Sequence, residues 1–240
     1  MIEHPLEPLG IAIAILVMAI GSALQASVGI GLALFVVPVL ALIDQSFIPG
    51  PMLLAGVVLA LLTAYRERTS IDAPALRNSL IGLAIGTILG ACALKFASAA
   101  NLDRTFGVLV LSAVLLSVSG YKFDATRRSL IFAGSAAGVM GAMVGIHGPP
   151  ISLVFQNSEP RVARAMLGAF FAMAYLGAVA ALTAFGLFGI PQLVRSAILL
   201  PGVAIGLAVA PLLARHIDGK RLRLVILGIA AISGLTLLLR

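Results

Sequence analysis

A run of two glycines, one histidine and two prolines interrupts an otherwise apolar stretch of this sequence, at Gly145-Ile146-His147-Gly148-Pro149-Pro150. The glycines favour a break in a helix and allow a ligand to approach the backbone closely. Pro149 and Pro150 suit the first turn of a new helix, where a missing N–H is no loss. A helix start of this kind directs N–H groups and a positive dipole end at the break, which favours bound anions. We interpret the run as half of an anion site; the alternative is that its glycines only pack helices.

A second interruption is predicted at Gly29-Ile30-Gly31, in another long apolar stretch that also contains Pro38. Polar residues flank both interruptions: Gln25, Ser27, His147, Gln156, Asn157 and Arg164. Polar side chains inside apolar stretches usually face a cavity or a partner helix. Together with Gly29, Gly31, Gly145, Gly148, Pro149 and Pro150, these six are the candidate substrate-binding residues.

Two of these residues have alternative interpretations. His147 can donate a hydrogen bond to an anion or change its charge during transport, but a histidine bonded to a carbonyl is an equal alternative. Arg164, a few residues inside its apolar stretch, can bind the anion or extend its charged end to the membrane interface. For Arg164 we favour the interface.

The sequence lacks the groups that energise many transporters. No glycine-rich nucleotide-binding loop ending in Gly-Lys is present, and no Asp or Glu lies well inside an apolar stretch. Carboxylates inside spans are the common proton-coupling device. We therefore expect transport driven by the substrate gradient and the membrane potential. The potential contributes about 2.3 kcal/mol of free energy per unit charge for each 100 mV.

The composition excludes a water-soluble domain. The chain is 61% hydrophobic and only 10% charged, with a mean hydropathy of +1.15, whereas soluble domains are about one quarter charged. The net charge of +7 comes from basic residues scattered between apolar runs, as in membrane topology signals, so no nucleic-acid partner is expected. The single cysteine, Cys92, is interpreted as a small buried apolar residue. No metal-ligand spacing is present, and no cofactor is expected.

Eight apolar stretches are predicted, and in lipid they must be helices because every backbone polar group needs an internal partner. They cover residues 9–43, 51–65, 79–94, 105–121, 129–156, 165–189, 196–213 and 222–239. The first and fifth are long and carry the two interruptions, which lie 116 residues apart. Gly82 and Gly86 match Gly202 and Gly206 at an offset of 120, and Gly107 matches Gly228 at 121. We therefore expect two membrane repeats, 1–121 and 129–240, joined by a cytoplasmic linker, 122–128.

The distribution of basic residues predicts how these stretches cross the membrane. If all eight cross once, Lys and Arg divide equally, eight to eight. If each interrupted stretch instead turns back to its starting side, twelve of the basic residues lie on one side of the membrane. The other four lie on the opposite side: Lys95, Arg104, Arg195 and Arg240. The second arrangement gives a positive-inside pattern. It also gives the two repeats opposite orientations, as in many secondary transporters, with both termini outside.

Both interruptions, and especially Gly145-Ile146-His147-Gly148-Pro149-Pro150, resemble the paired signatures of the sulfite exporter TauE/SafE family of permeases. The resemblance extends over essentially the whole chain, including the helix start between Arg161 and Arg164. His147 stands where the family more often has glycine. The resemblance implies a secondary permease of the cell inner membrane that moves sulfite, a sulfonate or a related organosulfur anion, in the export direction.

Two other functions were weighed against a permease. An intramembrane enzyme would pair His147 with a serine such as Ser135 or Ser152, but no G-x-S-x-G nucleophile motif supports it. A structural membrane subunit would leave the interrupted helices without a purpose. The expected partners are a small anionic substrate, membrane lipid and, as one candidate assembly, a second copy of the chain in a homodimer.

Overall fold

The structure is a computed structural model that describes residues 8–28, 32–97, 102–121, 123–213 and 219–239. Over these residues the chain is helical and forms no sheet, as the composition predicts. The ten α-helices are α1 (Pro8–Val28), α2 (Leu32–Ile43), α3 (Gly50–Arg66), α4 (Ala73–Phe96), α5 (Leu102–Val118), α6 (Arg127–Val144), α7 (Gly148–Phe155), α8 (Pro160–Ala184), α9 (Ile190–Leu213) and α10 (Gly219–Leu239). Two short 3-10 turns, η1 (Gln45–Phe47) and η2 (Arg68–Ser70), complete the described elements.

Side chains from the polar joints define where several helices begin. The carboxylate of Asp72 accepts a hydrogen bond of 3.1 Å from the Ala75 N–H and caps α4. Thr126 and Ser129 form a reciprocal capping box at the start of α6. These contacts satisfy N–H groups that the first helical turn leaves without partners. The polar joints predicted from sequence therefore act as helix stops and starts.

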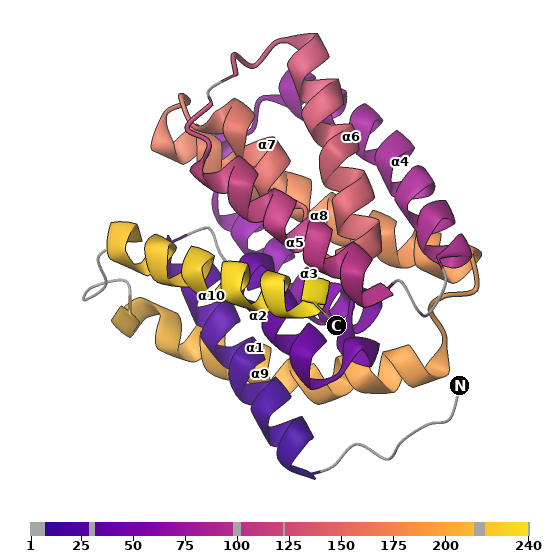
Figure 1. Cartoon of the computed structure of the whole chain (residues 1–240). Coiled ribbons are helices and arrows are strands. Elements are labelled where there is room, and N and C mark those ends of the chain that lie inside the picture. Colours follow the sequence, from indigo (N-terminus) through magenta and orange to yellow (C-terminus); the bar gives the residue numbers. More distant parts are fainter. Residues whose placement is uncertain (1–7, 29–31, 98–101, 122, 214–218, 240) are drawn as a thin grey trace.

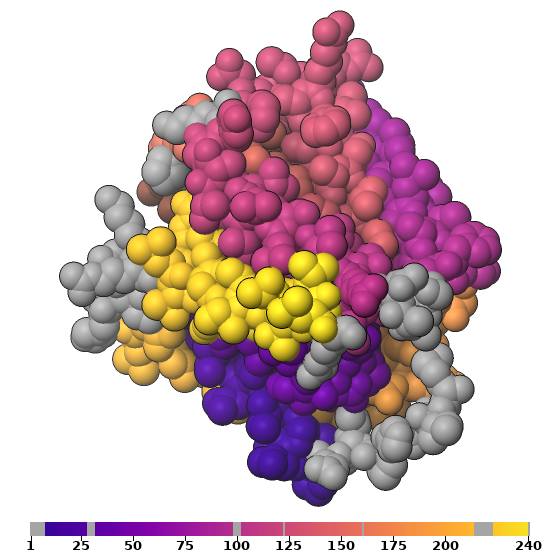
Figure 2. Space-filling model, in the orientation of Figure 1, coloured from indigo at the N-terminus to yellow at the C-terminus, as the bar shows by residue number. Residues whose placement is uncertain are grey.

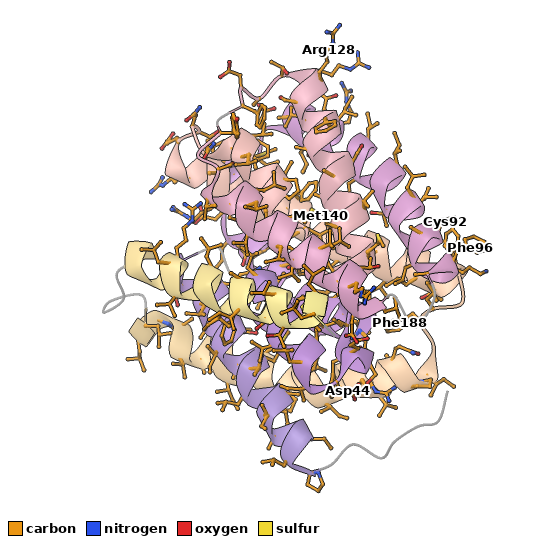
Figure 3. The ribbon with its side chains drawn as sticks, viewed as in Figure 1. Asp44, Cys92, Phe96, Arg128, Met140 and Phe188 are labelled. Carbon is orange, nitrogen blue, oxygen red and sulfur yellow. The ribbon has the colours of Figure 1, made fainter. Side chains whose placement is uncertain are left out.

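The outer surface of the bundle suits a lipid environment. By length and composition, four described helices can cross a membrane: α1, α4, α8 and α9. On α4 the side chains of Ile85, Ile88 and Leu89 are 51%, 57% and 58% exposed, which water would penalise and lipid does not. Figure 3 shows Arg128 projecting from the outer end of α6, with Met140 farther along the same helix within the bundle.

Each of the two long apolar stretches divides into a pair of helices that lie side by side. A Cβ built on Gly21 of α1 would lie 2.2 Å from the Val36 side chain of α2. Farther along α1, the Gln25 side chain accepts a hydrogen bond from the Leu32 N–H, at the start of α2. Because later residues of α1 meet earlier residues of α2, the two helices run antiparallel. In the other pair, α6 and α7, a hydrogen bond of 3.4 Å joins the two outer ends. The Phe123 N–H, just before α6, donates it to the Leu153 carbonyl oxygen near the end of α7. The chain thus turns back at both places. We call the junction between the end of α1 and the start of α2 the first break, and residues 145–147 the second break.

Glycines bring two pairs of helices into close parallel contact. On α4, Cβ atoms at Gly82 and Gly86 would lie 2.0 Å from the carbonyl oxygens of Ile131 and Ser135 on α6. On α9, Cβ atoms at Gly202 and Gly206 would lie 2.5 Å from the carbonyl oxygens of Ile15 and Ala19 on α1. Such small residues let membrane helices approach until their backbones touch. Figure 1 shows α4 beside α6 and α9 behind α1.

Two further helix pairs run antiparallel. Gly56 of α3 faces Tyr175 of α8, while Gly168 of α8 faces Thr63 near the end of α3. In the second pair, α10 lies along α5 and also covers α2 (Figures 1 and 2). Gly107 of α5 packs against the α10 backbone, with the Gly234 carbonyl oxygen 2.7 Å from its built Cβ.

One matched glycine lies outside the close helix crossings, and one expectation about burial needs correction. Gly228, matched to Gly107 at an offset of 121, has nothing within 4 Å of a built Cβ. Cys92 was expected to be buried, but it is a partly exposed free thiol at the outer edge of α4 (Figure 3). An edge position in lipid is as acceptable to a small apolar side chain as a protein core.

Candidate functional site

The second break has a backbone geometry that only glycine adopts readily. α6 ends at Val144, and Gly145 follows with a φ of +86°, in the left-handed region. A Cβ at Gly145 would also lie 2.8 Å from the Met52 side chain and 3.3 Å from that of Val37. The break is therefore wedged against α2 and α3, and α7 restarts at Gly148.

His147 occupies the position immediately before α7. Its side chain is only 1% exposed, and within the described part of the chain neither ring nitrogen has a hydrogen-bond partner. The Gly145 backbone interacts with the ring, but no contact of either ring nitrogen meets hydrogen-bond geometry. A buried polar group without a partner costs stability, so such a group marks a place where a ligand or water can bind.

The imidazole of His147 is held between α6 and α8. A Cβ built on Gly141 of α6 would lie 1.9 Å from Nε2 of His147, so the ring fills the space that this glycine leaves. On its other side the ring lies 5.4 Å from the ring of Tyr175, centroid to centroid. The phenyl ring of Phe171 in turn stacks on Tyr175 at 6.0 Å. These contacts fix the ring without satisfying its nitrogens.

The first break is closed by a side chain of the protein. The side-chain carbonyl oxygen of Gln25 accepts a hydrogen bond of 3.2 Å from the backbone N–H of Leu32, the first residue of α2. The side chain of Gln25 is 5% exposed and also interacts with the Tyr175 hydroxyl. Tyr175 therefore contacts polar groups that belong to both breaks.

The start of α7 offers few backbone donors. Pro149 and Pro150 follow Gly148 in the first turn and have no N–H group. Gly148 itself is partly exposed, and a Cβ built on it would meet only the Phe171 ring, at 3.7 Å. A single carbon at Gly148 would therefore meet no backbone or polar atom within 4 Å. An anion placed there would depend on the Gly148 N–H, the helix dipole and the His147 side chain.

Several predicted site residues lie away from this cluster. The Ser27 hydroxyl bonds the carbonyl oxygens of Ala23 and, at 3.2 Å, Ala210, which ties α1 to α9. Gln156, at the far end of α7, donates to the Tyr121 carbonyl, and Asn157 is exposed. Gly29 and Gly31 lie outside the described residues.

Arg164 forms an exposed ion pair instead of facing the breaks. Its guanidinium Nε lies 3.3 Å from the Glu67 carboxylate, and both side chains are substantially exposed. An exposed pair of this kind contributes between roughly zero and 1 kcal/mol. The interfacial position of Arg164 stays a prediction.

Tyr175 is the member of the cluster that sequence reasoning missed. It is one of three tyrosines in the chain, lies in the middle of the apolar α8 and is 2% exposed. A tyrosine buried in an apolar helix needs a partner for its hydroxyl, and that requirement was the available signal. Within the described residues, no group of three or more metal-ligating side chains exists.

Comparisons with known proteins identify a family. A family model described as "Sulfite exporter TauE/SafE" matches residues 13–237, nearly the whole chain. No curated protein and no solved structure matches the chain.

Proposed function

The chain belongs to the sulfite exporter TauE/SafE family, and from this membership we propose that it is a secondary permease that exports a small sulfur-containing anion. It is a multi-pass membrane transporter and not an enzyme. Three features of this function are our proposal: that the substrate is a sulfur-containing anion, that it moves outward, and that the protein lies in the cell inner membrane. The observation that carries the substrate chemistry is the buried His147 at the start of α7, without a hydrogen-bond partner among the described residues.

The proposal includes two repeats, which recurring contacts support. The glycine–carbonyl contact between Gly82 and Ile131 has a counterpart between Gly202 and Ile15. The partners are related by the offsets of 120 and 116 that recur in the sequence. In each case the third segment of one repeat packs on the first segment of the other. Helix packing alone would not reproduce both offsets.

An inverted orientation of the repeats is supported by the α3–α8 pair. These helices are equivalents, since Gly56 and Tyr175 differ by 119 residues and the flanking contacts follow the same spacing. They run antiparallel. Two equivalent helices that pack antiparallel across a membrane belong to repeats of opposite orientation. Gly56 and Tyr175 would then lie on the pseudo-two-fold axis, at the centre of the molecule.

The proposed substrate site lies beside the second break, with His147, Gly148 and the proline pair that follows. Gly145 provides the turn, and Gln25 and Tyr175 extend the polar surface toward the first break. Gly29 and Gly31 belong to the proposal through their equivalence to Gly145 and His147 in the other repeat. Gln156, Asn157 and Arg164 are not included, because they lie at the far end of α7 and beyond.

The driving force proposed is the substrate gradient together with the membrane potential. Among the described residues, the buried polar and charged set is Ser22, Gln25, Ser79, Thr87, His147, Ser196 and Ser233, without any Asp, Glu, Lys or Arg. Coupling ions are commonly held by buried acids. An inside-negative potential drives a singly charged anion outward without such coupling.

Flux measurements test the function directly. Purified protein in liposomes should transport ³⁵S-labelled sulfite or a labelled singly charged sulfonate such as methanesulfonate faster than protein-free liposomes. With sodium absent, equal pH on both sides and a valinomycin-set potassium potential, the rate should follow the voltage. Flux that requires an imposed sodium or proton gradient would overturn the driving force proposed. Chemical conversion of the substrate, or no flux at all, would overturn the permease.

A further inference from the structure

The two breaks are equivalent in sequence position but are built differently. At the offset of 116, Gln25 corresponds to Gly141, and Leu32, the first residue of α2, corresponds to Gly148, the first residue of α7. By the same offset His147 corresponds to Gly31. Each equivalent pair thus has a glycine in one repeat and a polar or bulkier residue in the other. The polar groups at the two breaks therefore cannot have equivalent roles.

At the first break the protein supplies its own acceptor. The side-chain amide oxygen of Gln25 accepts a hydrogen bond of 3.2 Å from the Leu32 N–H. This oxygen therefore occupies the position in front of α2 where an anion would bind. The Tyr175 hydroxyl also interacts with the Gln25 side chain. An N–H that already donates to an internal oxygen is not available to a ligand.

At the second break the corresponding side chain is missing. Gly141 has no side chain to reach the Gly148 N–H, and the His147 ring lies in the vacated space, 1.9 Å from a Cβ built there. The helix start at His147 has no side-chain cap. Both imidazole nitrogens are buried without a partner among the described residues. The second break therefore combines an uncapped helix start with a buried donor that has nothing to bind.

We propose that the chain binds one anion at a time, at the second break only, with the imidazole of His147 and the Gly148 N–H as donors, while Gln25 keeps the first break closed. This assignment rests on the proposed permease function and specifies its site. His147 is then the residue that contacts the substrate, and Gln25 is a structural cap. Tyr175 positions both.

The charges around the site specify the class of anion. Every described Lys and Arg side chain is exposed, except for the half-buried Arg195 near the start of α9. The site therefore offers at most one full positive charge, that of an imidazolium. A doubly charged anion buried there would lack a compensating charge. A singly charged oxyanion matches this charge, and the Phe171 ring, 3.7 Å from a Cβ built on Gly148, is an apolar neighbour for the small substituent of a sulfonate.

The histidine side chains provide a spectroscopic test on the full-length protein. The chain has three histidines, His4, His147 and His216, so ¹⁵N-imidazole labelling in detergent gives few signals, and His147→Gln identifies the signal of interest. Methanesulfonate, with one charge, should shift the His147 signal in a saturable way with one site per chain. Sulfate, of similar size with two charges, should bind at least roughly tenfold more weakly. An unshifted His147 signal, two sites per chain, or equal binding of sulfate would each overturn the proposal.

A second measurement remains informative if the glutamine variant folds poorly. His147→Leu removes both unpartnered nitrogens at similar volume, so its unfolding temperature without anion should equal or exceed that of the wild type. Methanesulfonate should raise the unfolding temperature of the wild type and not that of His147→Leu. Equal stabilisation of both proteins would overturn the proposal. If the wild type transports sulfonate but the His147 signal does not shift, the site assignment is wrong and the proposed permease function is kept. If the wild type shows neither transport nor a shifted signal, both the assignment and the proposed function are wrong.

Discussion

Tyr175 fills the space that Gly56 leaves on the facing helix, and its ring lies 3.0 Å from a Cβ built on that glycine. The same ring is 5.4 Å from His147, and its hydroxyl meets Gln25. One side chain thus joins the two breaks through the centre of the bundle. The stability of the site should therefore depend on the ring more than on the hydroxyl.

We expect Tyr175→Phe to lower the free energy of unfolding by about 1 kcal/mol, the typical net worth of one hydrogen bond. Tyr175→Ala should lower it by roughly 3–5 kcal/mol, because it removes a buried aromatic side chain. Thermal unfolding in detergent, followed by circular dichroism at 222 nm, measures both. Tyr121→Phe, at a side chain that is 68% exposed, is the control and should change nothing. Equal losses for the two Tyr175 variants would contradict this order.

A methyl group on Gly141 should disable the site without preventing insertion. Gly141→Ala places a carbon 1.9 Å from Nε2 of His147, so the ring must leave its place at a cost of roughly 1–3 kcal/mol. Sulfonate flux should fall at least about tenfold, which corresponds to 1.4 kcal/mol. Gly177→Ala, where nothing lies within 4 Å of the new carbon, is the matched control. Wild-type flux in the Gly141 variant would show that the position of His147 is unimportant.

The glycine crossings make a separate prediction about stability. Gly86→Ala and Gly206→Ala push a methyl group into carbonyl oxygens 2.0 and 2.5 Å away. Each should destabilise the protein by roughly 1–3 kcal/mol and lower its unfolding temperature in detergent. Gly228→Ala faces open space and should be neutral or slightly stabilising, because alanine is the better helix former. A neutral result at both crossings would argue against close backbone contact there.

The helices and their interruptions could be predicted from sequence because both signals are local. Apolar runs between charged joints predicted the spans, and dense glycine with proline predicted the helix restart at Gly148. The two repeats that the constant offsets predict stay a prediction, and the contacts of Gly82 and Gly202 recur at those offsets. Gly107 packs against the α10 backbone, whereas its sequence match Gly228 has no neighbour within 4 Å of a built Cβ.

The composition of the site could be predicted only in part, because it depends on which segments meet. His147 was singled out as the titratable residue within a break, and Gln25 as a polar residue near one. That Gln25 caps α2 follows from the antiparallel return of α2 along α1. That Tyr175 lies at the centre follows from the glycine opposite it, on a helix more than one hundred positions away. Long-range pairings of this kind leave no local signal.

Topology provides another test, since the twelve-to-four division of basic residues predicts that both termini are outside the cytoplasm. A phosphatase fused after Arg240 should be active in cells, and a fluorescent protein fused there should be dark. The same pair of reporters inserted in the linker between α5 and α6 should give the opposite result. A fluorescent C-terminal fusion would mean that the interrupted segments cross the membrane instead of turning back.

The most direct test of the account compares flux through the wild type with flux through Gly148→Leu in liposomes. A Cβ at residue 148 meets only the edge of Phe171, at 3.7 Å, so the first carbon of the new side chain enters without a clash, and we expect the variant to insert. Its bulk would fill the space in front of α7 where the anion is proposed to bind. We predict wild-type insertion and unfolding temperature with sulfonate flux reduced to the protein-free background. Normal flux through a correctly inserted Gly148→Leu protein would contradict an anion site at the second break.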